Sequence, residues 1–262
     1  MNADELKVLF IGNSFSDNMI HNLYPIAKAF GYKKVRICNL YIGGCTIETH
    51  VDNLRFNKPA YTYREVSDET NGVIVSTDNV KMIDGIKDDN WDFISFQQAS
   101  HYSGLKETYS DGLLPELIDY VKSNMTNPKA KFMWHMTWAY QQDSTHPDFY
   151  RYEYSQKKMY ECICDCVKNY IIPNNSIDLV IPSGMMIQKL RETSFGDTLT
   201  GDGYHLNLYG EAGIGIIFMM IVSHKGRSSF NDEMLQPELR EYIDLYFDAA
   251  NKSLNDYSKL EK

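Results

Sequence analysis

Five short polar segments of the chain combine residue types that can form or break a covalent bond. Four of them directly follow apolar runs, and the fifth lies closer to the C-terminus. In order they are GNSFS at 12–16, YIGGC at 41–45, QQASH at 97–101, HMTW at 135–138 and GDGYH at 201–205. In an open parallel sheet, ligands bind at the carboxyl ends of the strands. We therefore expect a hydroxyl, side-chain amides, flexible glycines and an Asp/His pair to meet at one edge of a sheet.

Ser14 is the candidate nucleophile. It stands between a predicted strand and a predicted helix, where free backbone N–H groups and the helix dipole favour a developing negative charge. A serine hydroxyl is a weak nucleophile and needs a nearby base to take its proton. The segment is not the Gly-x-Ser-x-Gly turn of α/β-hydrolases. The competing interpretation is that Ser14, Ser16 and Asp17 only cap the helix.

His205 is the candidate base, and Asp202 is the residue that would orient it. A spacing of three can place both side chains on one side of a tight turn. A carboxylate bound to the imidazole Nδ1 fixes the tautomer and leaves Nε2 free to accept a proton from serine. The competing interpretation is a plain surface turn, because Gly-Asp-Gly is common in turns. The Gly-Asn-Ser segment after the first strand favours the catalytic interpretation.

Gly44 and the pair Gln97 and Gln98 are candidates for stabilising a negatively charged oxygen. Acyl transfer builds charge on the carbonyl oxygen, and fixed N–H donors must meet it. Glycine lets the backbone approach closely, and glutamine carries a side-chain amide. The alternatives are that Gly44 only forms a turn and that the glutamines only anchor a loop.

Aromatic and histidine side chains after the third and fourth predicted strands are candidates for lining a substrate cleft. The substrate-binding candidates are His101, Trp138 and Tyr140. Packing against helices is the alternative for Trp138. A metal site would need a set of ligands such as His135, Asp143 and His146. We predict no metal and no other cofactor, because a serine mechanism already accounts for the polar edge.

Apolar runs and helical periodicity alternate along the chain. The predicted strands are 7–11, 35–40, 93–96, 131–136 and 179–181, with a hairpin at 61–66 and 73–76. The predicted helices are 19–30, 79–87, 113–123, 149–170, 184–193, 207–222 and 237–254. Strands separated by single helices imply right-handed crossovers and a parallel sheet covered on both faces. We predict one domain over 1–262, a flavodoxin-like three-layer α/β/α sandwich with a five-stranded, mainly parallel sheet, a small β-hairpin insertion at about 60–77 and a C-terminal helix at about 237–254.

The composition argues against several classes of partner. The 262 residues include 26 Lys and Arg against 35 Asp and Glu, which gives a formal charge of -9. Such an acidic chain lacks the basic surface of a nucleic-acid-binding protein and does not suit an anionic membrane. Its most hydrophobic stretch, 214–222, is too short to cross a bilayer. The polar N-terminus shows no secretion signal, which predicts a cytoplasmic protein, or a secreted or periplasmic one if a signal has been removed.

The order of these segments resembles that of the SGNH (GDSL-like) hydrolases, which are esterases and lipases on a flavodoxin-like sandwich. The likeness rests on residues 7–16 as the serine block, Gly43-Gly44 as the glycine block and 201–205 as the Asp-x-x-His block. The resemblance implies these roles: Ser14 as nucleophile, His205 as base, Asp202 behind it, and the N–H groups of Ser14 and Gly44 as two of three oxyanion donors.

The chain departs from this family after the third predicted strand. The family usually has Gly-x-Asn-Asp there, and its Asn side chain is the third oxyanion donor. This sequence has Gln97-Gln98-Ala99-Ser100 instead. We expect Gln98 to be the substitute donor, with Gln97 as the alternative. The departure indicates a divergent subfamily.

Together these features predict a serine-dependent ester hydrolase that acts through an acyl-enzyme. The favoured substrate is a small-molecule or glycan ester, from which small O-acyl groups such as acetyl are removed. One alternative is a carbohydrate-binding or scaffolding protein on an inactivated esterase fold. Another is a thioesterase or lysophospholipase with the same triad. No long hydrophobic lid segment is evident, which speaks against a long-chain lipase.

Overall fold

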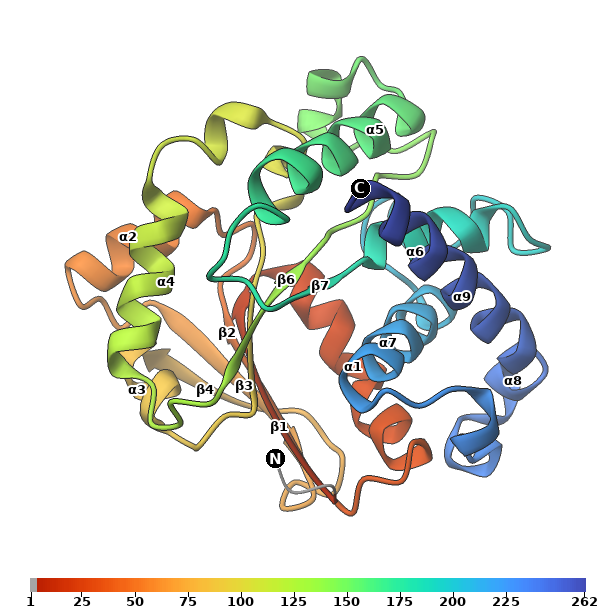
Figure 1. The fold of residues 1–262 in the computed structure, drawn as a ribbon, viewed down its shortest axis with the longest axis horizontal. Coiled ribbons are helices and arrows are strands. Elements are labelled where there is room, and N and C mark those ends of the chain that lie inside the picture. Colours follow the sequence, from red (N-terminus) through yellow and green to blue (C-terminus); the bar gives the residue numbers. More distant parts are fainter. Residues whose placement is uncertain (1–3) are drawn as a thin grey trace.

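A seven-stranded sheet separates two layers of helices in the computed structural model, which describes residues 4–262 (Figure 1). The strands are β1 (Glu5–Gly12), β2 (Lys34–Tyr41), β3 (Tyr61–Ser67), β4 (Val75–Val80), β5 (Phe93–Phe96), β6 (Lys131–His135) and β7 (Leu179–Ile181). Their order across the sheet is β4-β3-β2-β1-β5-β6-β7. Strands β2, β1, β5, β6 and β7 run parallel, in the order typical of flavodoxin-like sheets. The predicted three-layer α/β/α fold is therefore confirmed.

The predicted hairpin is part of the central sheet. β3 pairs antiparallel with β2, from Arg36 opposite Ser67 to Tyr41 opposite Thr62, and β4 pairs with β3. The sheet therefore has seven strands where five were predicted, and the hairpin covers an edge that β2 would otherwise expose. Because β4 continues to Val80, the next helix begins at Met82 and not at the predicted residue 79.

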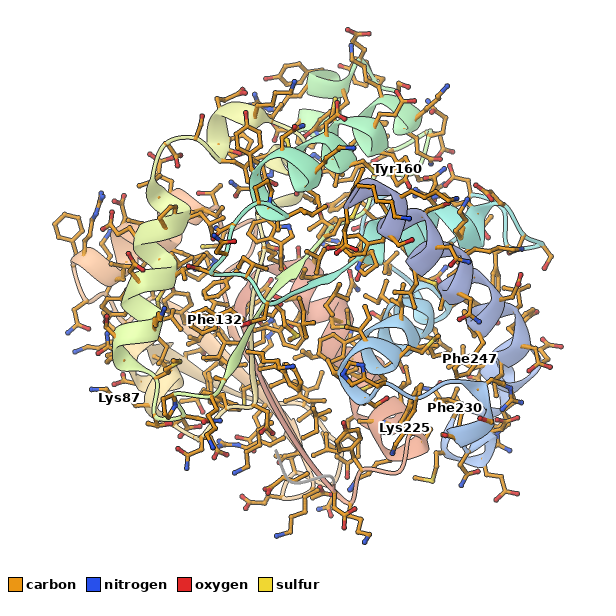
Figure 2. All side chains as sticks on the ribbon, in the orientation of Figure 1. Lys87, Phe132, Tyr160, Lys225, Phe230 and Phe247 are labelled. Carbon is orange, nitrogen blue, oxygen red and sulfur yellow. The ribbon has the colours of Figure 1, made fainter. Side chains whose placement is uncertain are left out.

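The helices form the two outer layers. They are α1 (Ser14–Ala29), α2 (Ile47–Arg55), α3 (Met82–Lys87), α4 (Leu113–Asn124), α5 (Gln156–Cys166), α6 (Ser183–Arg191), α7 (Leu208–Ser223), α8 (Pro237–Arg240) and α9 (Ile243–Leu260). On one side of the sheet α7 contacts α1, α6 and α9, and on the other side α4 contacts α2 and α3 (Figure 1). Side chains fill the space between the layers (Figure 2). The sequence pattern did not indicate α2.

The long helix predicted over 149–170 is interrupted. In its place are a 3₁₀ turn (Pro147–Tyr152), α5, and a π-helical turn (Val167–Ile171). The break falls at Glu153 and Tyr154, which both adopt a positive φ. Non-glycine residues rarely adopt this conformation, so the sequence carries no signal for the break.

The C-terminal helix is held by aromatic packing. The predicted helix over 237–254 consists of α8 and α9, and α9 continues to Leu260. The ring of Phe247 on α9 lies 5.3 Å from that of Phe230, measured between centroids (Figure 2). Its centroid lies 6.1 Å from that of Phe30. No helix within residues 4–262 combines the length and the apolar character that crossing a membrane requires.

Candidate active site

A pocket of about 330 Å³ opens at the carboxyl edge of the parallel strands. Its lining includes residues singled out from the sequence, namely Ser14, Gly43, Gly44, His101 and His205, together with His146, one of the histidines expected to line a cleft. The lining also includes Tyr41, Ser100, Asp148 and Tyr204, to which sequence reasoning gave no part in substrate binding or catalysis. Residues from both ends of the chain therefore share one pocket.

Ser14 is the first residue of α1, and Asn13 caps that helix. The Asn13 Oδ1 accepts a hydrogen bond from the Phe15 N–H at 3.0 Å. Ser16 is buried, and its hydroxyl donates to the Asn13 backbone carbonyl. The Ser14 hydroxyl makes no hydrogen bond within the described part of the chain. The capping role considered for Ser14 therefore belongs to Asn13, and the Ser14 hydroxyl is left free in the pocket.

Asp202 holds the imidazole of His205. Its Oδ2 lies 2.7 Å from Nδ1 of His205, and its Oδ1 accepts the backbone N–H groups of His205 (2.8 Å) and Tyr204 (3.1 Å). Partial burial acts to raise the pKa of Asp202, but these hydrogen bonds hold that pKa below its ordinary value. The ionised carboxylate keeps the imidazole proton on Nδ1 and leaves Nε2 as the acceptor. Ser14 and His205 are not hydrogen-bonded to each other here, and catalytic hydrogen bonds often tighten only when substrate binds.

The turn that carries Asp202 and His205 is fastened to the segment after β6. Gly203 has a φ of +93°, which glycine adopts without strain, and its carbonyl accepts the Gln141 N–H at 2.8 Å. The Tyr204 carbonyl accepts the indole N–H of Trp138, also at 2.8 Å. These two bonds fix the turn, and with it the imidazole of His205, against the end of the sheet.

Two backbone N–H groups in the pocket are available to an anion. The N–H of Ser14 lies in the first turn of α1, where it has no acceptor within the helix. The N–H of Gly44 makes no hydrogen bond within the described part of the chain, and its φ of +64° lies in the region that favours glycine. Asn13 joins the two, because its Nδ2 donates to the carbonyl of Cys45 at 3.0 Å. Two such donors suit the oxyanion of acyl transfer.

Neither glutamine after β5 lines the pocket. The Oε1 of Gln98 accepts the N–H groups of Ile47 (3.1 Å) and Ala99 (2.8 Å), and its Nε2 lies 3.5 Å from the Thr108 carbonyl. Gln97 is likewise bonded to protein groups, and both side chains are buried. The expectation that Gln98, or Gln97, completes the oxyanion hole is therefore corrected: both amides anchor protein segments.

Gln97 belongs to a buried chain of polar side chains behind Ser14. Its Nε2 donates to the Asn13 Oδ1 at 2.6 Å, and its Oε1 lies 3.0 Å from Nδ1 of His135. The Oδ1 of Asn13 can only accept a hydrogen bond, so the side chain of Gln97 must turn its NH₂ group towards Asn13. The Gln97 oxygen then faces His135, which donates a hydrogen bond through Nδ1. Burial lowers the pKa of His135 to about 3, so this imidazole is neutral. The chain locks Asn13, the residue that joins Ser14 to the Gly44 loop.

His135 makes the stability of the protein sensitive to acid. Its pKa is about 3 in the folded protein against an ordinary value of 6.5, so within this pH range the unfolded chain binds a proton that the folded chain does not. The free energy of unfolding should therefore fall as pH drops through this range, by about 1.4 kcal/mol per pH unit for this group alone. His135→Asn keeps a donor near the position of Nδ1 and removes this titration. It should therefore reduce the slope in urea denaturation between about pH 4 and 6 by about 1.4 kcal/mol per pH unit, while buried His50, whose pKa is also about 3, keeps its own contribution.

His224→Asn is the matched control for this measurement. His224 is exposed at the end of α7 and has a positive φ, which asparagine also tolerates. This variant should keep the pH dependence of the wild type. An unchanged slope in His135→Asn, or an equal change in both variants, would contradict the assignment.

Trp138 and Tyr140 support the pocket from behind. Both side chains are 0% exposed. Trp138 stacks on Phe15 with ring centroids 4.1 Å apart, and the Tyr140 hydroxyl lies 2.8 Å from Oγ of Ser100. The prediction that these two residues bind substrate is wrong, because both rings are enclosed by protein. His101, the third residue of that prediction, does line the pocket.

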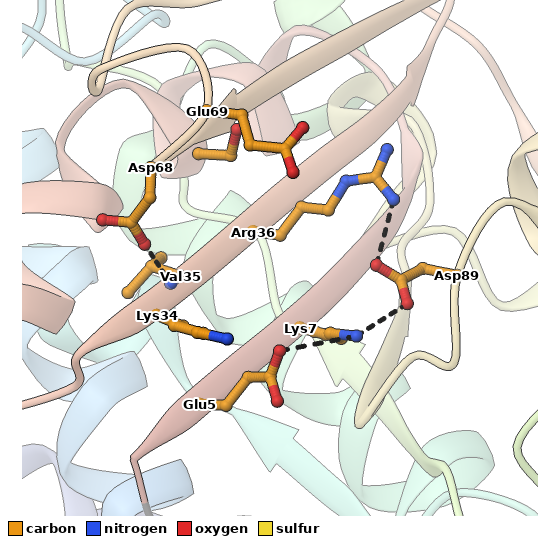
Figure 3. Close-up of a pocket in the computed structure, with 9 residues that line it drawn as sticks. Glu5, Lys7, Lys34, Val35, Arg36, Asp68, Glu69 and Asp89 are labelled. Atoms are coloured by element: carbon orange, nitrogen blue, oxygen red, sulfur yellow. Dashed lines mark hydrogen bonds and ion pairs between the residues drawn. The ribbon is translucent and has the colours of Figure 1, made fainter.

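A second hollow, of about 260 Å³, lies at the opposite edge of the sheet, where β1 and β2 begin (Figure 3). Its central charges are paired with one another. Asp89 lies 2.8 Å from Nζ of Lys7 and 3.0 Å from the guanidinium of Arg36, and Glu5 lies 3.5 Å from Nζ of Lys7. Ligands of parallel sheets bind at the other edge. We therefore assign the candidate active site to the pocket that contains Ser14.

Comparisons with known proteins agree with this fold. The structure is similar to that of a DUF4886 family protein from Bacteroides uniformis ATCC 8492, with 35% sequence identity, a TM-score of 0.86, and coverage of 99% of this chain and 97% of that chain. Two further structures share the fold at low identity. One is a protein proposed to be an SGNH hydrolase, from Slackia heliotrinireducens, with 16% identity, a TM-score of 0.50 and coverage of 84% and 98%. The other is Axe2, an acetylxylan esterase from Geobacillus stearothermophilus, with 13% identity, a TM-score of 0.51 and coverage of 84% and 95%.

The family assignment rests on most of the chain. A search of curated proteins found no match. Residues 7–221, however, match the family described as domain of unknown function DUF4886, and the Bacteroides uniformis relative agrees with this over nearly the full length. The chain therefore belongs to the DUF4886 family, on an α/β fold similar to that of SGNH hydrolases.

Proposed function

We propose that this protein is a serine-dependent ester hydrolase. One arrangement carries the proposal: a free Ser14 hydroxyl, an imidazole of His205 held by Asp202, and the unpartnered N–H groups of Ser14 and Gly44 all serve one pocket. Similarity of fold to an acetylxylan esterase adds support. The arrangement contains the nucleophile, base and oxyanion donors that acyl transfer needs.

The reaction proceeds in two halves. Oγ of Ser14 attacks the ester carbonyl carbon while its proton passes to Nε2 of His205, and the carbonyl electron pair moves to oxygen, where the two N–H groups receive it. The intermediate then expels the alcohol oxygen, which takes the proton from His205, and an acyl-enzyme remains. A water molecule gives a proton to His205 and attacks the acyl carbon. The acid leaves, and the proton returns to Ser14.

A small acyl group such as acetyl is the proposed acyl part. Apart from glycines, Phe15 and Pro147 are the only described lining residues with wholly apolar side chains. The described lining contains no leucine, isoleucine, valine or methionine, against which a long acyl chain commonly packs. This lining of rings and polar groups favours a short acyl group on a polar alcohol.

Covalent labelling tests the proposal. A fluorophosphonate probe should add to Ser14 in the folded protein, with hydrolysis of p-nitrophenyl acetate lost in proportion to labelling. Peptide mapping by mass spectrometry identifies the modified serine, and denatured protein, which should not react, is the control. Labelling of another serine, or active protein that no probe inhibits, would refute Ser14 as the nucleophile.

A further inference from the structure

We propose that the pocket wall beyond His205 binds the hydroxyl groups of a carbohydrate leaving alcohol. This polar wall consists of Tyr204, His146, His101 and Asp148. The inference rests on the proposed esterase function, in which His205 returns its proton to the leaving alcohol oxygen. The alcohol must therefore lie on the His205 side of the pocket, and the acyl group on the side of the oxyanion donors.

Three rings continue from the imidazole of His205 along the pocket. The ring centroids are 4.3 Å apart for His205 and Tyr204, 4.7 Å for Tyr204 and His146, and 6.2 Å for His146 and His101. The last two rings are nearly parallel, at 21°. All four residues line the same pocket. An alcohol that extends away from His205 therefore runs along the polar wall.

His146 gives the polar wall a hydrogen-bond donor. Its Nδ1 accepts the backbone N–H of Asp148 at 3.1 Å, so the neutral ring carries its proton on Nε2. Burial lowers the pKa of His146, which keeps the ring neutral at neutral pH. The Nε2 atom makes no hydrogen bond within the described part of the chain and is not enclosed by it. It is free to donate to the oxygen of a substrate hydroxyl.

Asp148 gives the polar wall an acceptor. Its Oδ1 accepts from Nε of Arg151 at 2.9 Å, its Oδ2 has no partner within the described part of the chain, and the side chain is 29% exposed. A carboxylate accepts strong hydrogen bonds from hydroxyl groups. None of the described residues that line the pocket is a lysine or an arginine, so the lining presents no cation to a phosphate group. The polar wall therefore suits neutral hydroxyl groups better than the phosphorylated alcohols or thiols of lysophospholipids and acyl-CoA.

Two variants and three esters test this inference. The esters are p-nitrophenyl acetate, whose alcohol has no second hydroxyl, a methyl xyloside that carries one acetyl group, and the same xyloside fully acetylated. We expect the wild type to prefer the mono-acetylated to the fully acetylated xyloside. In Asp148→Asn and in His146→Phe, kcat/KM for the mono-acetylated xyloside relative to p-nitrophenyl acetate should fall about 10- to 100-fold, the loss expected for a hydrogen bond to a charged or buried group.

Asp119→Asn is the matched control. Asp119 is exposed on α4 and does not line the pocket, so this variant should keep the wild-type ratio. Asp148→Asn retains an acceptor for Arg151, and His146→Phe retains a ring. If one variant fails to fold, the other still tests the polar wall. If the ratio of the two kcat/KM values were unchanged in both Asp148→Asn and His146→Phe, or fell equally in Asp119→Asn, the binding role of the polar wall would be refuted. The esterase proposal would still stand. A wild type that hydrolyses none of the three esters would overturn the esterase proposal itself.

Discussion

Replacement of Ser14 by alanine is expected to lower kcat/KM for p-nitrophenyl acetate by about 10³- to 10⁶-fold. The substitution removes the oxygen that attacks the ester carbon and leaves the other groups of the pocket in place. The Ser14 hydroxyl makes no hydrogen bond within the described part of the chain, so the free energy of unfolding should stay within about 0.5 kcal/mol of the wild type. Steady-state hydrolysis and urea denaturation of the purified variant measure the two quantities.

Ser16→Ala is the matched control for this variant. The Ser16 hydroxyl is buried and bonded to the Asn13 carbonyl (2.7 Å) and to Oδ1 of Asn39 (3.0 Å). Its removal should cost about 1 to 3 kcal/mol of stability while most of the activity remains. Full activity in Ser14→Ala, or an activity loss in Ser16→Ala as large as in Ser14→Ala, would contradict the role given to Ser14.

The second large effect is expected from Gln97→Glu, which should lower kcat/KM about 100-fold, as loss of an oxyanion donor does. The ionised carboxylate would face the Asn13 oxygen that now receives the Gln97 NH₂ group at 2.6 Å. Repulsion between the two oxygens would displace Asn13, which aligns the N–H groups of Ser14 and Gly44. A protonated carboxyl group can still donate to Asn13. The activity of the variant relative to the wild type should therefore rise as pH falls, as parallel pH–rate profiles would show.

Gln98→Glu makes the same chemical change one residue later. Both glutamines are 2% exposed, but the Gln98 oxygen already accepts two N–H groups, from Ile47 and Ala99, and these favour a carboxylate. We expect Gln98→Glu to stay within about tenfold of the wild type, since it loses only the long contact to Thr108. A larger loss in Gln98→Glu than in Gln97→Glu would restore Gln98 as an oxyanion donor and contradict the anchoring role.

The parts of the site that sequence alone locates are those whose contacts are local. Asp202 and His205 stand three residues apart in one turn, and only Asn13 separates Ser14 from the end of β1. The spacing therefore fixes most of their geometry. The amide of Gln97 is oriented by Asn13, 84 residues away, and no local pattern carries that information.

The same distinction between local and long-range contacts explains where the fold and the pocket lining differ from the sequence-based predictions. β1 is recognisable because a strand buried on both faces of a parallel sheet reads as a continuous apolar run. The sequence predicted the second strand of the hairpin at 73–76. β4 (Val75–Val80) is almost wholly exposed, so only its pairing with β3 defines where it begins and ends. Trp138 follows a strand, as substrate-contacting residues often do, but its side chain turns towards Phe15. Asp148 is one of two acids in the segment 141–150, and only the folded pocket distinguishes it.

The supports of Ser14 and His205 are joined, and this has a consequence for catalysis. Asn13 ties Ser14 to the Gly44 loop, and Trp138 holds the turn that carries His205. Trp138 also stacks on Phe15 beside Ser14, and Asn18 on α1 exchanges two hydrogen bonds with the backbone of Leu206. In the proposed reaction, nucleophile and base are therefore pre-organised before substrate arrives, and recognition of the sugar serves to place the ester between them.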